Sequence, residues 1–304
     1  MQTTPEITAR SWAMIATLGL VWGGTFMVQS IALETTPPFW VASARIGFAA
    51  LLTGVVWRLR GGRMFTTDQT DWPKLVIVAL LSSAVPFMCL SWGQQFVPSA
   101  FAGVSMATVT LFILPLAHLF IPGERMTWRR VVGFILGFIG VAVLIGPAAL
   151  ASTGDPLEGW GRLACLAAAG CYGVSSIMMR RLPPIDPVGL TFAVVAIGAF
   201  FVIPIAAVTH GAPEYPGAKG LAALALLGLV PTAAANLLRI LVVRSAGPVF
   251  MSLTNYLVPL VSILFGWAVL NETLPPSLFY SMALILAGVF LSQWGALRRL
   301  FTRS

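Results

Sequence analysis

Long apolar runs alternate with short polar connections along the whole chain. A transmembrane helix needs about 20 predominantly apolar residues, and ten stretches meet that requirement. They cover residues 11–33, 38–57, 73–96, 100–121, 128–149, 160–181, 187–209, 219–243, 247–270 and 275–297. The pattern therefore predicts an all-α integral membrane protein with ten transmembrane helices.

The first apolar run, residues 12–33, is also the position at which a secretory signal peptide would stand. It exceeds the roughly 7–15 apolar residues of a signal-peptide core, and no convincing cleavage site follows it. We expect it to remain in the protein as the first span.

Basic residues divide unevenly between the two sets of connections. One set, which includes both termini, holds nearly all of them, for example Arg58 and Arg129, whereas the other set holds Arg162 and Lys219. Cytoplasmic loops carry an excess of Lys and Arg, so both termini are predicted to be cytoplasmic. The formal net charge of +8 then reflects topology and contact with anionic lipids rather than nucleic-acid binding.

The second half of the chain repeats the first. Ala102-Gly103-Val104 recurs as Ala246-Gly247-Pro248, and Leu111–Leu116 recurs as Asn255–Leu260, both at an offset of 144 residues. Two five-helix units are expected, over residues 11–149 and 160–297. Because five is odd, the second unit enters the membrane from the opposite side, which makes an inverted repeat. Inverted repeats in apolar chains indicate secondary transporters, with alternating access around a central cavity between the units.

Composition narrows the chemistry further. Hydrophobic residues make up 58% of the chain and charged residues 9%, against roughly 25% charged in soluble domains. No phosphate-binding loop with the Gly-Lys-Ser/Thr signature occurs, so nothing supports ATP hydrolysis. No cofactor or metal site is predicted, because the three cysteines lack metal-ligand spacing.

Every acidic residue falls in a predicted connection or terminus. Proton-coupled carriers and cation exporters often use buried carboxylates, so a cation-drug pump with an intramembrane Glu is disfavoured. His118, late in the fourth span, is the remaining titratable candidate; the simpler interpretation is a hydrogen-bonded histidine near the end of that span.

Several short motifs carry a resemblance to a known family. They are Leu20-Val21-Trp22-Gly23-Gly24-Thr25-Phe26, Arg45, Pro115 and Gly123-Glu124 in the first unit, and Tyr172-Gly173-Val174-Ser175-Ser176, Pro187, Pro259 and Asn271-Glu272 in the second. Over nearly its whole length the chain resembles the drug/metabolite transporter superfamily, specifically the ten-span bacterial exporters built from two EamA-type units. Among these it looks most like the YddG-type aromatic amino-acid exporters. It departs from the pattern at Val195, where a counterpart of Arg45 would fall.

The resemblance implies a secondary carrier of the bacterial inner membrane that exports small metabolites, commonly amino acids. A zwitterionic amino acid in a low-dielectric cavity needs dipoles or charges for its ends and apolar surface for its side chain. The candidates for substrate binding are Trp22, Thr25, Gln29, Arg45, Ser91, Trp92, Gln94, Gln95, Tyr172, Ser175, Asn236, Ser252, Asn255 and Tyr256. At an offset of 150, Trp22 pairs with Tyr172 and Thr25 with Ser175. For Ser and Thr, helix packing is the more common role.

Arg45 lies about seven residues, or roughly 10 Å, into its span. A guanidinium suits bidentate recognition of a substrate carboxylate; the alternative is a structural role at a helix end or a gate. Prolines interrupt spans and are candidates for bends used in gating, or for static kinks. These prolines are Pro86, Pro115, Pro204, Pro231 and Pro259.

Two further features have a structural interpretation. Glu124 and Glu272 precede the last helix of each unit, where a carboxylate favours capping of a helix N-terminus. Gly133, Gly137 and Gly140 permit close helix approach in the fifth span, for packing within the chain or for a dimer face. The oligomeric state stays open.

Other functions remain as alternatives. A broader-specificity drug or metabolite permease of the same superfamily is one, and a channel is another. An intramembrane lipid-modifying enzyme would need a cluster of catalytic His, Asp or Glu, and the two histidines are far apart in sequence with no carboxylate pair beside them. The expected partners are a small-molecule substrate and membrane lipids.

Overall fold

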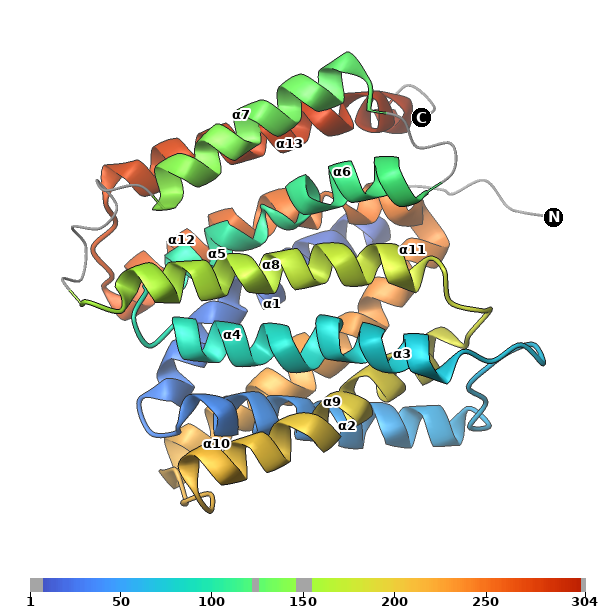
Figure 1. Ribbon diagram of the computed structural model, residues 1–304, viewed down its shortest axis with the longest axis vertical. Helices are drawn as coiled ribbons and strands as arrows, with labels where there is room; N and C mark the ends of the chain where they lie inside the picture. The colour runs from blue at the N-terminus through green and yellow to red at the C-terminus, as the bar shows by residue number, and fades with distance from the viewer. Residues whose placement is uncertain (1–7, 122–125, 146–154, 302–304) are drawn as a thin grey trace.

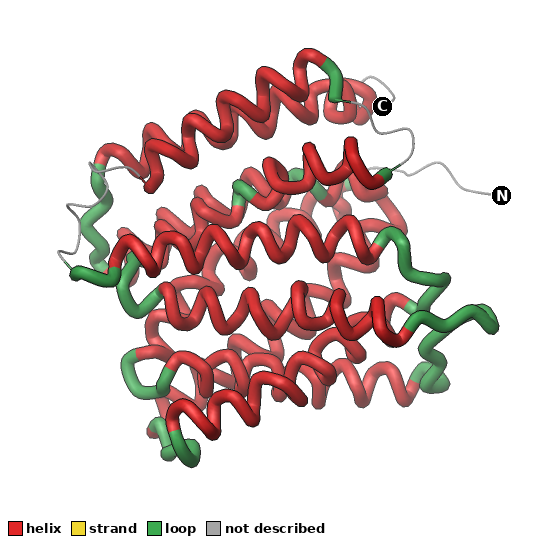
Figure 2. The backbone as a smooth tube through the Cα atoms, in the orientation of Figure 1, coloured by secondary structure: helices red, strands yellow, loops and turns green. Residues whose placement is uncertain are grey.

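The computed structural model describes residues 8–121, 126–145 and 155–301. In these ranges the chain is helical, with no strand and one isolated β-bridge between Phe65 and Ile185. Figure 2 shows the helices running roughly parallel, with loops gathered at the two ends of the bundle. The predicted all-α class is confirmed.

The helices of the first half are α1 (Ala9–Leu33), α2 (Pro38–Leu59), α3 (Trp72–Ala79), π-helical η1 (Leu80–Ala84), α4 (Val85–Gly93), α5 (Ser99–Met106), α6 (Val109–Phe120) and α7 (Trp128–Ile145). Those of the second half are α8 (Glu158–Met179), α9 (Pro187–His210), α10 (Gly217–Leu227), π-helical η3 (Gly228–Ala234), α11 (Ala235–Met251), α12 (Thr254–Leu270) and α13 (Pro276–Phe301).

Eight helical stretches among the described residues are long and apolar enough to cross a membrane, and Thr254–Leu270 is a shorter apolar helix. The α7 helix adds 18 residues that lie beside α13. The chain is therefore a multi-pass membrane protein, and the count of ten spans stays a prediction.

The two halves share the same departures from regular helix. Each third span contains a π-helical segment, η1 next to Pro86 and η3 around Pro231. Proline lacks the N–H that an α-helix needs at that point, so the local hydrogen-bond pattern widens. Each fourth span is broken for two residues, at 107–108 between α5 and α6 and at 252–253 between α11 and α12.

Side-chain hydroxyls satisfy carbonyls at both breaks. Thr108 Oγ1 donates to the Ser105 carbonyl at 2.6 Å, and Thr254 Oγ1 donates to the Met251 carbonyl at 2.8 Å. Irregular backbone at membrane depth is tolerated where its polar groups find partners. The internal repeat of the sequence is thus also a repeat of local structure.

Helices of one half pack mainly against helices of the other, and the contacts come in related pairs. The α2 helix packs on its counterpart α9, α7 on α13, and α5 on α12. The contact of α1 with α12 has its counterpart in that of α8 with α6. Figure 1 shows α7 beside α13 along one edge of the bundle and α2 beside α9 along the other. The two halves are interlocked rather than set side by side.

The glycine stripe of α7 packs within the chain. A Cβ on Gly133 would lie 2.5 Å from the Gly288 carbonyl of α13, and one on Gly140 would lie 2.8 Å from Ile285 Cγ1. Gly137 faces Leu111 instead. Close packing of two helices requires hydrogen in place of a side chain at these positions. The interpretation of the stripe as an intramolecular face is confirmed.

One predicted boundary is wrong. We expected a connection at residues 244–246, but the helix continues from Gly217 through η3 to Met251, and α12 begins at Thr254. The Gly247-Pro248 pair is a turn signal in sequence. In the structure the break lies instead at 252–253, where the Thr254 hydroxyl satisfies the Met251 carbonyl.

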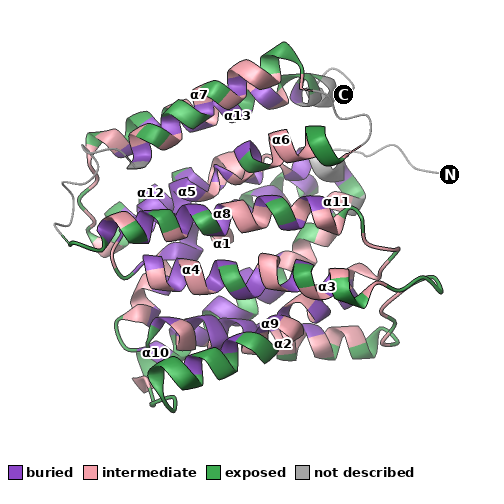
Figure 3. Ribbon diagram, in the orientation of Figure 1, coloured by how far each residue is buried: buried purple, intermediate pink, exposed green. Residues whose placement is uncertain are grey.

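The outer surface is strongly apolar. Val208 and Phe200 are 87% and 74% exposed, and Figure 3 shows exposed residues along the edges of the bundle with buried residues toward its centre. An apolar outer surface suits contact with the hydrocarbon core of a bilayer.

Candidate functional site

Arg45 of α2 is the centre of a polar cluster that joins the two halves. Its side chain is 6% exposed. Nε donates to Thr232 Oγ1 of η3 at 2.8 Å, and Nη1 donates to Gln29 Oε1 of α1 at 3.0 Å. The guanidinium carbon also lies 4.1 Å from the centre of the Phe87 ring, within cation–π range. Three elements from both halves therefore fix its position.

Two glutamines extend this cluster. Gln29 is fully buried, and its Nε2 donates to Gln94 Oε1 at 2.6 Å. Gln94, which follows α4, donates in turn to the Phe26 carbonyl at 3.0 Å and to Ser30 Oγ at 3.2 Å. The amide nitrogen of Gln29 is used in the bond to Gln94, so its oxygen is available to accept from Arg45. These bonds hold the guanidinium in place.

The charge of Arg45 is not neutralised within the described part of the chain. No described carboxylate lies within ion-pair distance of it. Its Nη2 atom has no hydrogen-bond partner among the described residues and is not completely enclosed by them. A buried cation is costly unless an anion meets it, and this one keeps a donor free for such an anion.

The two groups that flank Arg45 occupy equivalent positions in the repeat. Phe87 directly follows Pro86 at η1, and Thr232 directly follows Pro231 in η3. Both contacts of Arg45 are thus set by the paired π-helical irregularities, which are often found at functional sites.

Aromatic residues of both halves surround the same region. Trp22 Nε1 donates to the Pro231 carbonyl at 3.0 Å. Tyr172 packs against the hydrophobic cluster that contains Phe87. The predicted pair of Trp22 and Tyr172 therefore lies close to the Arg45 cluster.

A second polar contact joins the two helix breaks. Thr110 and Asn255 are each the second residue of the helix that follows a break, and Asn255 Nδ2 donates to Thr110 Oγ1 at 3.2 Å. Ser252 Oγ donates to Gln293 Oε1 of α13 at 3.0 Å. Tyr256 Oη is buried without a hydrogen-bond partner among the described residues.

Of the remaining candidates, Asn236 reaches the Arg45 cluster through the backbone of Thr232, and the others join neither cluster. Thr25, Ser175 and Asn236 bond carbonyls of their own helices, at 2.9, 3.1 and 2.6 Å. Gln95 is exposed and donates to the Trp92 carbonyl at 3.1 Å, while Trp92 packs on Phe96. Ser91 Oγ is buried without a partner in the described part. Of the predicted prolines, Pro115, Pro204 and Pro259 lie inside helices and Pro86 and Pro231 lie at the π segments.

Sequence reasoning missed Thr232, Phe87, Ser30 and Thr110. The signal that was available for the first two is their place after matched prolines, one in each half. Thr110 and Ser30 carry no such signal, because single hydroxyl residues in apolar spans most often bond their own helix.

Acidic residues differ most from expectation. Glu158 was placed in a connection, but it is the first residue of α8, is 2% exposed, and forms an ion pair with Arg162 one turn later. The Arg162 guanidinium lies 5.5 Å from the centre of the Phe101 ring, and Leu278 lines the same small pocket as the two charged residues.

Glu272 does cap a helix, but not the one that follows it. Its two carboxylate oxygens accept from the backbone N–H groups of Ser99 at 2.6 Å and Ala100 at 3.1 Å, at the N-terminus of α5. Asn271 takes a left-handed conformation with φ of 53° and ends α12, which turns Glu272 toward α5. The cap thus joins the two halves, whereas Glu124 lies outside the described residues.

His118 fits the simpler of its two interpretations. It is exposed near the end of α6, and its Nδ1 accepts from the Met126 N–H at 3.3 Å.

The sequence of the chain matches a known family of proteins. The profile of the EamA-like transporter family matches the chain twice, at residues 10–146 and 159–294. An uncharacterized inner membrane transporter of Escherichia coli K12, YedA, is 27% identical over 91% of this chain and 89% of its own. A probable terminal-alkyne amino-acid exporter of Streptantibioticus cattleyicolor is 27% identical over 92% of both chains.

Two further similarities are more distant. An uncharacterized transporter of Bacillus subtilis, YoaV, is 21% identical over 94% of this chain and 97% of its own. A solved crystal structure superposes with a TM-score of 0.64 at 21% identity and covers 96% of this chain, which shows a shared fold.

Proposed function

The chain belongs to the EamA-like transporter family, and on that premise we propose that it exports small metabolites across the bacterial inner membrane. Amino acids are the proposed substrates, with aromatic ones favoured. Both termini lie in the cytoplasm, and the carrier alternates access between its two inverted units.

The observation that carries the proposal is the incomplete neutralisation of Arg45. A guanidinium with one nitrogen that no described group bonds, and with no carboxylate partner among the described residues, is suited to bind a substrate carboxylate. The other contacts of Arg45 are neutral groups from both halves. In the proposed complex, Arg45 therefore supplies the positive charge and the substrate carboxylate supplies the negative charge.

Aromatic preference follows from the neighbours of this charge. Trp22, Phe87 and Tyr172 bring three aromatic side chains to the region of Arg45. Aromatic rings stack at low entropic cost and add to binding beyond the area they bury. The similarity to a probable amino-acid exporter supports the same substrate class.

The proposed motion bends the spans at their shared irregularities. The π segments η1 and η3 and the breaks at 107–108 and 252–253 interrupt the helices at corresponding positions of the two halves of the sequence. Proline-induced gaps in the hydrogen-bond ladder are the usual sites of helix bending. Thr232 of η3 bonds Arg45, so bending at η3 changes the position of the substrate site as well.

Uptake into proteoliposomes tests the proposal. Labelled phenylalanine, tryptophan, alanine and a cationic drug are offered to liposomes that hold purified protein, with and without an imposed pH gradient. We expect saturable uptake of the aromatic amino acids, indifferent to the pH gradient, because no described carboxylate contacts the site.

A matched pair of variants tests whether phenylalanine flux depends on the charge of Arg45. Arg45→Gln removes the charge, whereas Arg239→Gln removes a charge from the exposed face of α11. We expect loss of phenylalanine flux in the first and unchanged flux in the second. Equal phenylalanine flux in the two variants would refute the role of Arg45. Uptake of the drug without uptake of amino acids would favour a broader permease. A flux that does not saturate with substrate concentration would favour a channel.

A further inference from the structure

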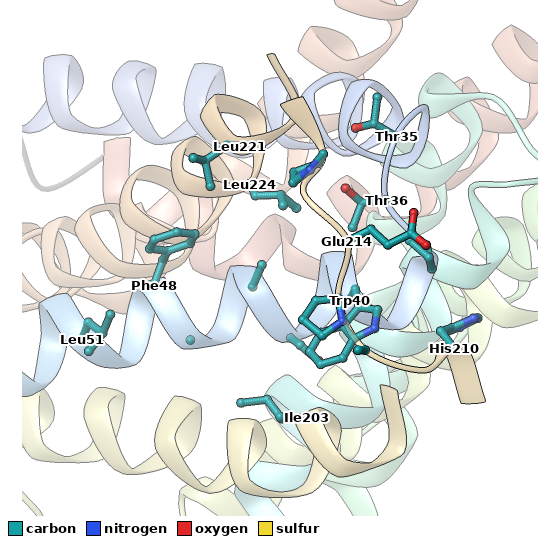
Figure 4. Close-up of a pocket in the computed structure, with 17 residues that line it drawn as sticks. Thr35, Thr36, Trp40, Phe48, Leu51, Ile203, His210, Glu214, Leu221 and Leu224 are labelled. Atoms are coloured by element: carbon teal, nitrogen blue, oxygen red, sulfur yellow. The ribbon is translucent and has the colours of Figure 1, made fainter. Parts of the chain in front are cut away.

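A groove runs along the side of the bundle, away from the Arg45 cluster. It lies between α2, the end of α9, the connection at 211–216 and the start of α10, and its volume is about 530 Å³, within the range of ligand sites in proteins. Figure 4 shows its lining side chains along α2, with Leu51 and Phe48 at one end and Thr36, Glu214 and His210 at the other.

The lining changes from polar to apolar along the length of the groove. Thr35, Thr36 and Glu214 lie at the end where α2 begins, and Phe48, Leu51 and Leu221 lie deeper along the span. Its rim is open to the hydrocarbon, since Leu51 is 68% and Leu221 44% exposed. An occupant must therefore have a polar head and an apolar tail.

Two polar groups at the head of the groove lack partners. Thr36 is 9% exposed, and its Oγ1 is buried with no hydrogen-bond partner among the described residues although it lines the groove. Glu214 forms no described ion pair, because the nearby Lys219 pairs with Glu34 at 2.7 Å. An unsatisfied donor and a free carboxylate call for an acceptor oxygen and a cation respectively.

The length of the groove matches one leaflet of a bilayer. From Trp40 to Leu51 the α2 helix rises about 16 Å at 1.5 Å per residue, and half of the hydrocarbon core is about 15 Å thick. A single acyl chain that enters from the leaflet around the start of α2 would fill it.

We propose that this groove binds one phospholipid with an ethanolamine headgroup, with an acyl chain along α2 and the ammonium at Glu214. After rotation of its side chain toward the groove, the buried Thr36 hydroxyl donates to an ester or phosphate oxygen of the same lipid. Phosphatidylcholine lacks the N–H donors that an ammonium offers the carboxylate, so the groove prefers ethanolamine over choline. This inference does not depend on the transported substrate.

Gly47 provides a way to fill the groove without disturbing the fold. It lines the groove, and a Cβ built on it meets no atom within 4 Å. Gly159, near the start of α8 and outside the groove, has the same open surroundings and serves as the control. Gly→Phe changes at the two positions therefore carry similar local costs.

Native mass spectrometry of purified protein tests the proposal with phosphatidylethanolamine and phosphatidylcholine of identical chains. The wild type is expected to retain one ethanolamine lipid, Gly47→Phe to lose it, and Gly159→Phe to keep it. Since an exposed ion pair is worth roughly 0.2–1 kcal/mol, ethanolamine should be preferred over choline by about 1.4- to 5-fold, and Glu214→Gln should abolish that preference. Thermal unfolding confirms that each variant is folded.

Three results would overturn the proposal. Equal lipid retention by Gly47→Phe and the wild type would place the lipid elsewhere. Equal retention of the two lipids by the wild type would remove the role of Glu214. Loss of phenylalanine binding in Gly47→Phe with the lipid still retained would make the groove part of the substrate path instead.

Discussion

Two buried arginines, one in each half, differ in how their positive charges are neutralised. Arg162 is 2% exposed and is neutralised by Glu158, one turn earlier in the same helix. Arg45 is 6% exposed and bonds only neutral groups, which come from α1 and η3. Each lies over a phenylalanine ring, at 5.5 Å for Arg162 and 4.1 Å for Arg45.

The difference separates a structural charge from a functional one. A pair within one helix is complete before the helices assemble, so it stabilises whatever arrangement buries it. A cation held by neutral groups from both halves is incomplete, and it gains its counter-charge only when an anion arrives. Burial alone therefore does not distinguish the two roles; the identity and the origin of the partners do.

Removing one member of the complete pair has the largest expected effect. Arg162→Met leaves the buried Glu158 carboxylate without the charge of Arg162, which costs about 3–5 kcal/mol of unfolding free energy. Unfolding in mixed detergent micelles measures it. The double variant Glu158→Gln with Arg162→Met is the control and should recover most of the loss; a loss as large as that of the single variant would show that packing, not charge, stabilises this region.

Removing the incomplete charge should act on binding rather than on stability. Hydrogen bonds to charged groups contribute about 1.5–3 kcal/mol, so Arg45→Gln should weaken phenylalanine binding by roughly 10- to 100-fold. Its unfolding free energy should change by less than that of Arg162→Met. Calorimetric titration of phenylalanine measures the binding, and a destabilisation that matches Arg162→Met without loss of affinity would reverse the comparison.

Glu272 is an intermediate case, a carboxylate that meets backbone dipoles of the other half. Glu272→Ala removes both acceptors for the α5 N-terminus and should cost about 1 kcal/mol of unfolding free energy, as for other helix caps. Glu272→Gln retains one acceptor oxygen and should cost less. Hydrogen exchange of the Ser99 and Ala100 amides provides the direct measurement; unchanged protection in Glu272→Ala would show that the cap is dispensable.

The smallest effect is expected at Asp71, which caps α3 at the edge of its span. Hydrogen bonds from the Lys74 side chain and backbone N–H hold the pKa of Asp71 below its ordinary value of 3.8. The contribution of this carboxylate to stability is thus present above pH 3.8 and is lost as the pH falls through the lower folded-state pKa. The difference in unfolding temperature between wild type and Asp71→Asn should shrink from about pH 5 to about pH 3, and a constant difference would contradict the cap.

Much of the fold follows from the sequence, because apolar length and repetition of motifs act locally. The helix at 38–59 and the glycine stripe of α7 needed no tertiary information. The partner of Glu272 did need it, since the nearest helix in sequence is not the nearest in space. The continuous helix through residue 244 was missed because the Gly247-Pro248 pair signals a turn in sequence, whereas the structure breaks the helix at 252–253.

The candidate site was predictable in part. Arg45, Gln29 and Gln94 stand out as polar residues in apolar spans, and the structure brings them together. Thr232 did not stand out, because a threonine in a span usually bonds its own helix. It does so here as well, donating to the Leu227 carbonyl at 2.8 Å, and its second role as acceptor for Arg45 depends on the π turn around Pro231.

The interlocking of the halves has a consequence for biosynthesis. The α7 helix finds its main partner only in α13, whose first residue is made 131 residues after the last residue of α7. At roughly 5–20 residues per second, this interval lasts about 7–26 s. During that time the close-packing face of α7 must be covered by lipid or by the insertion machinery. The bundle can therefore be completed only after its last helix has been synthesised and inserted.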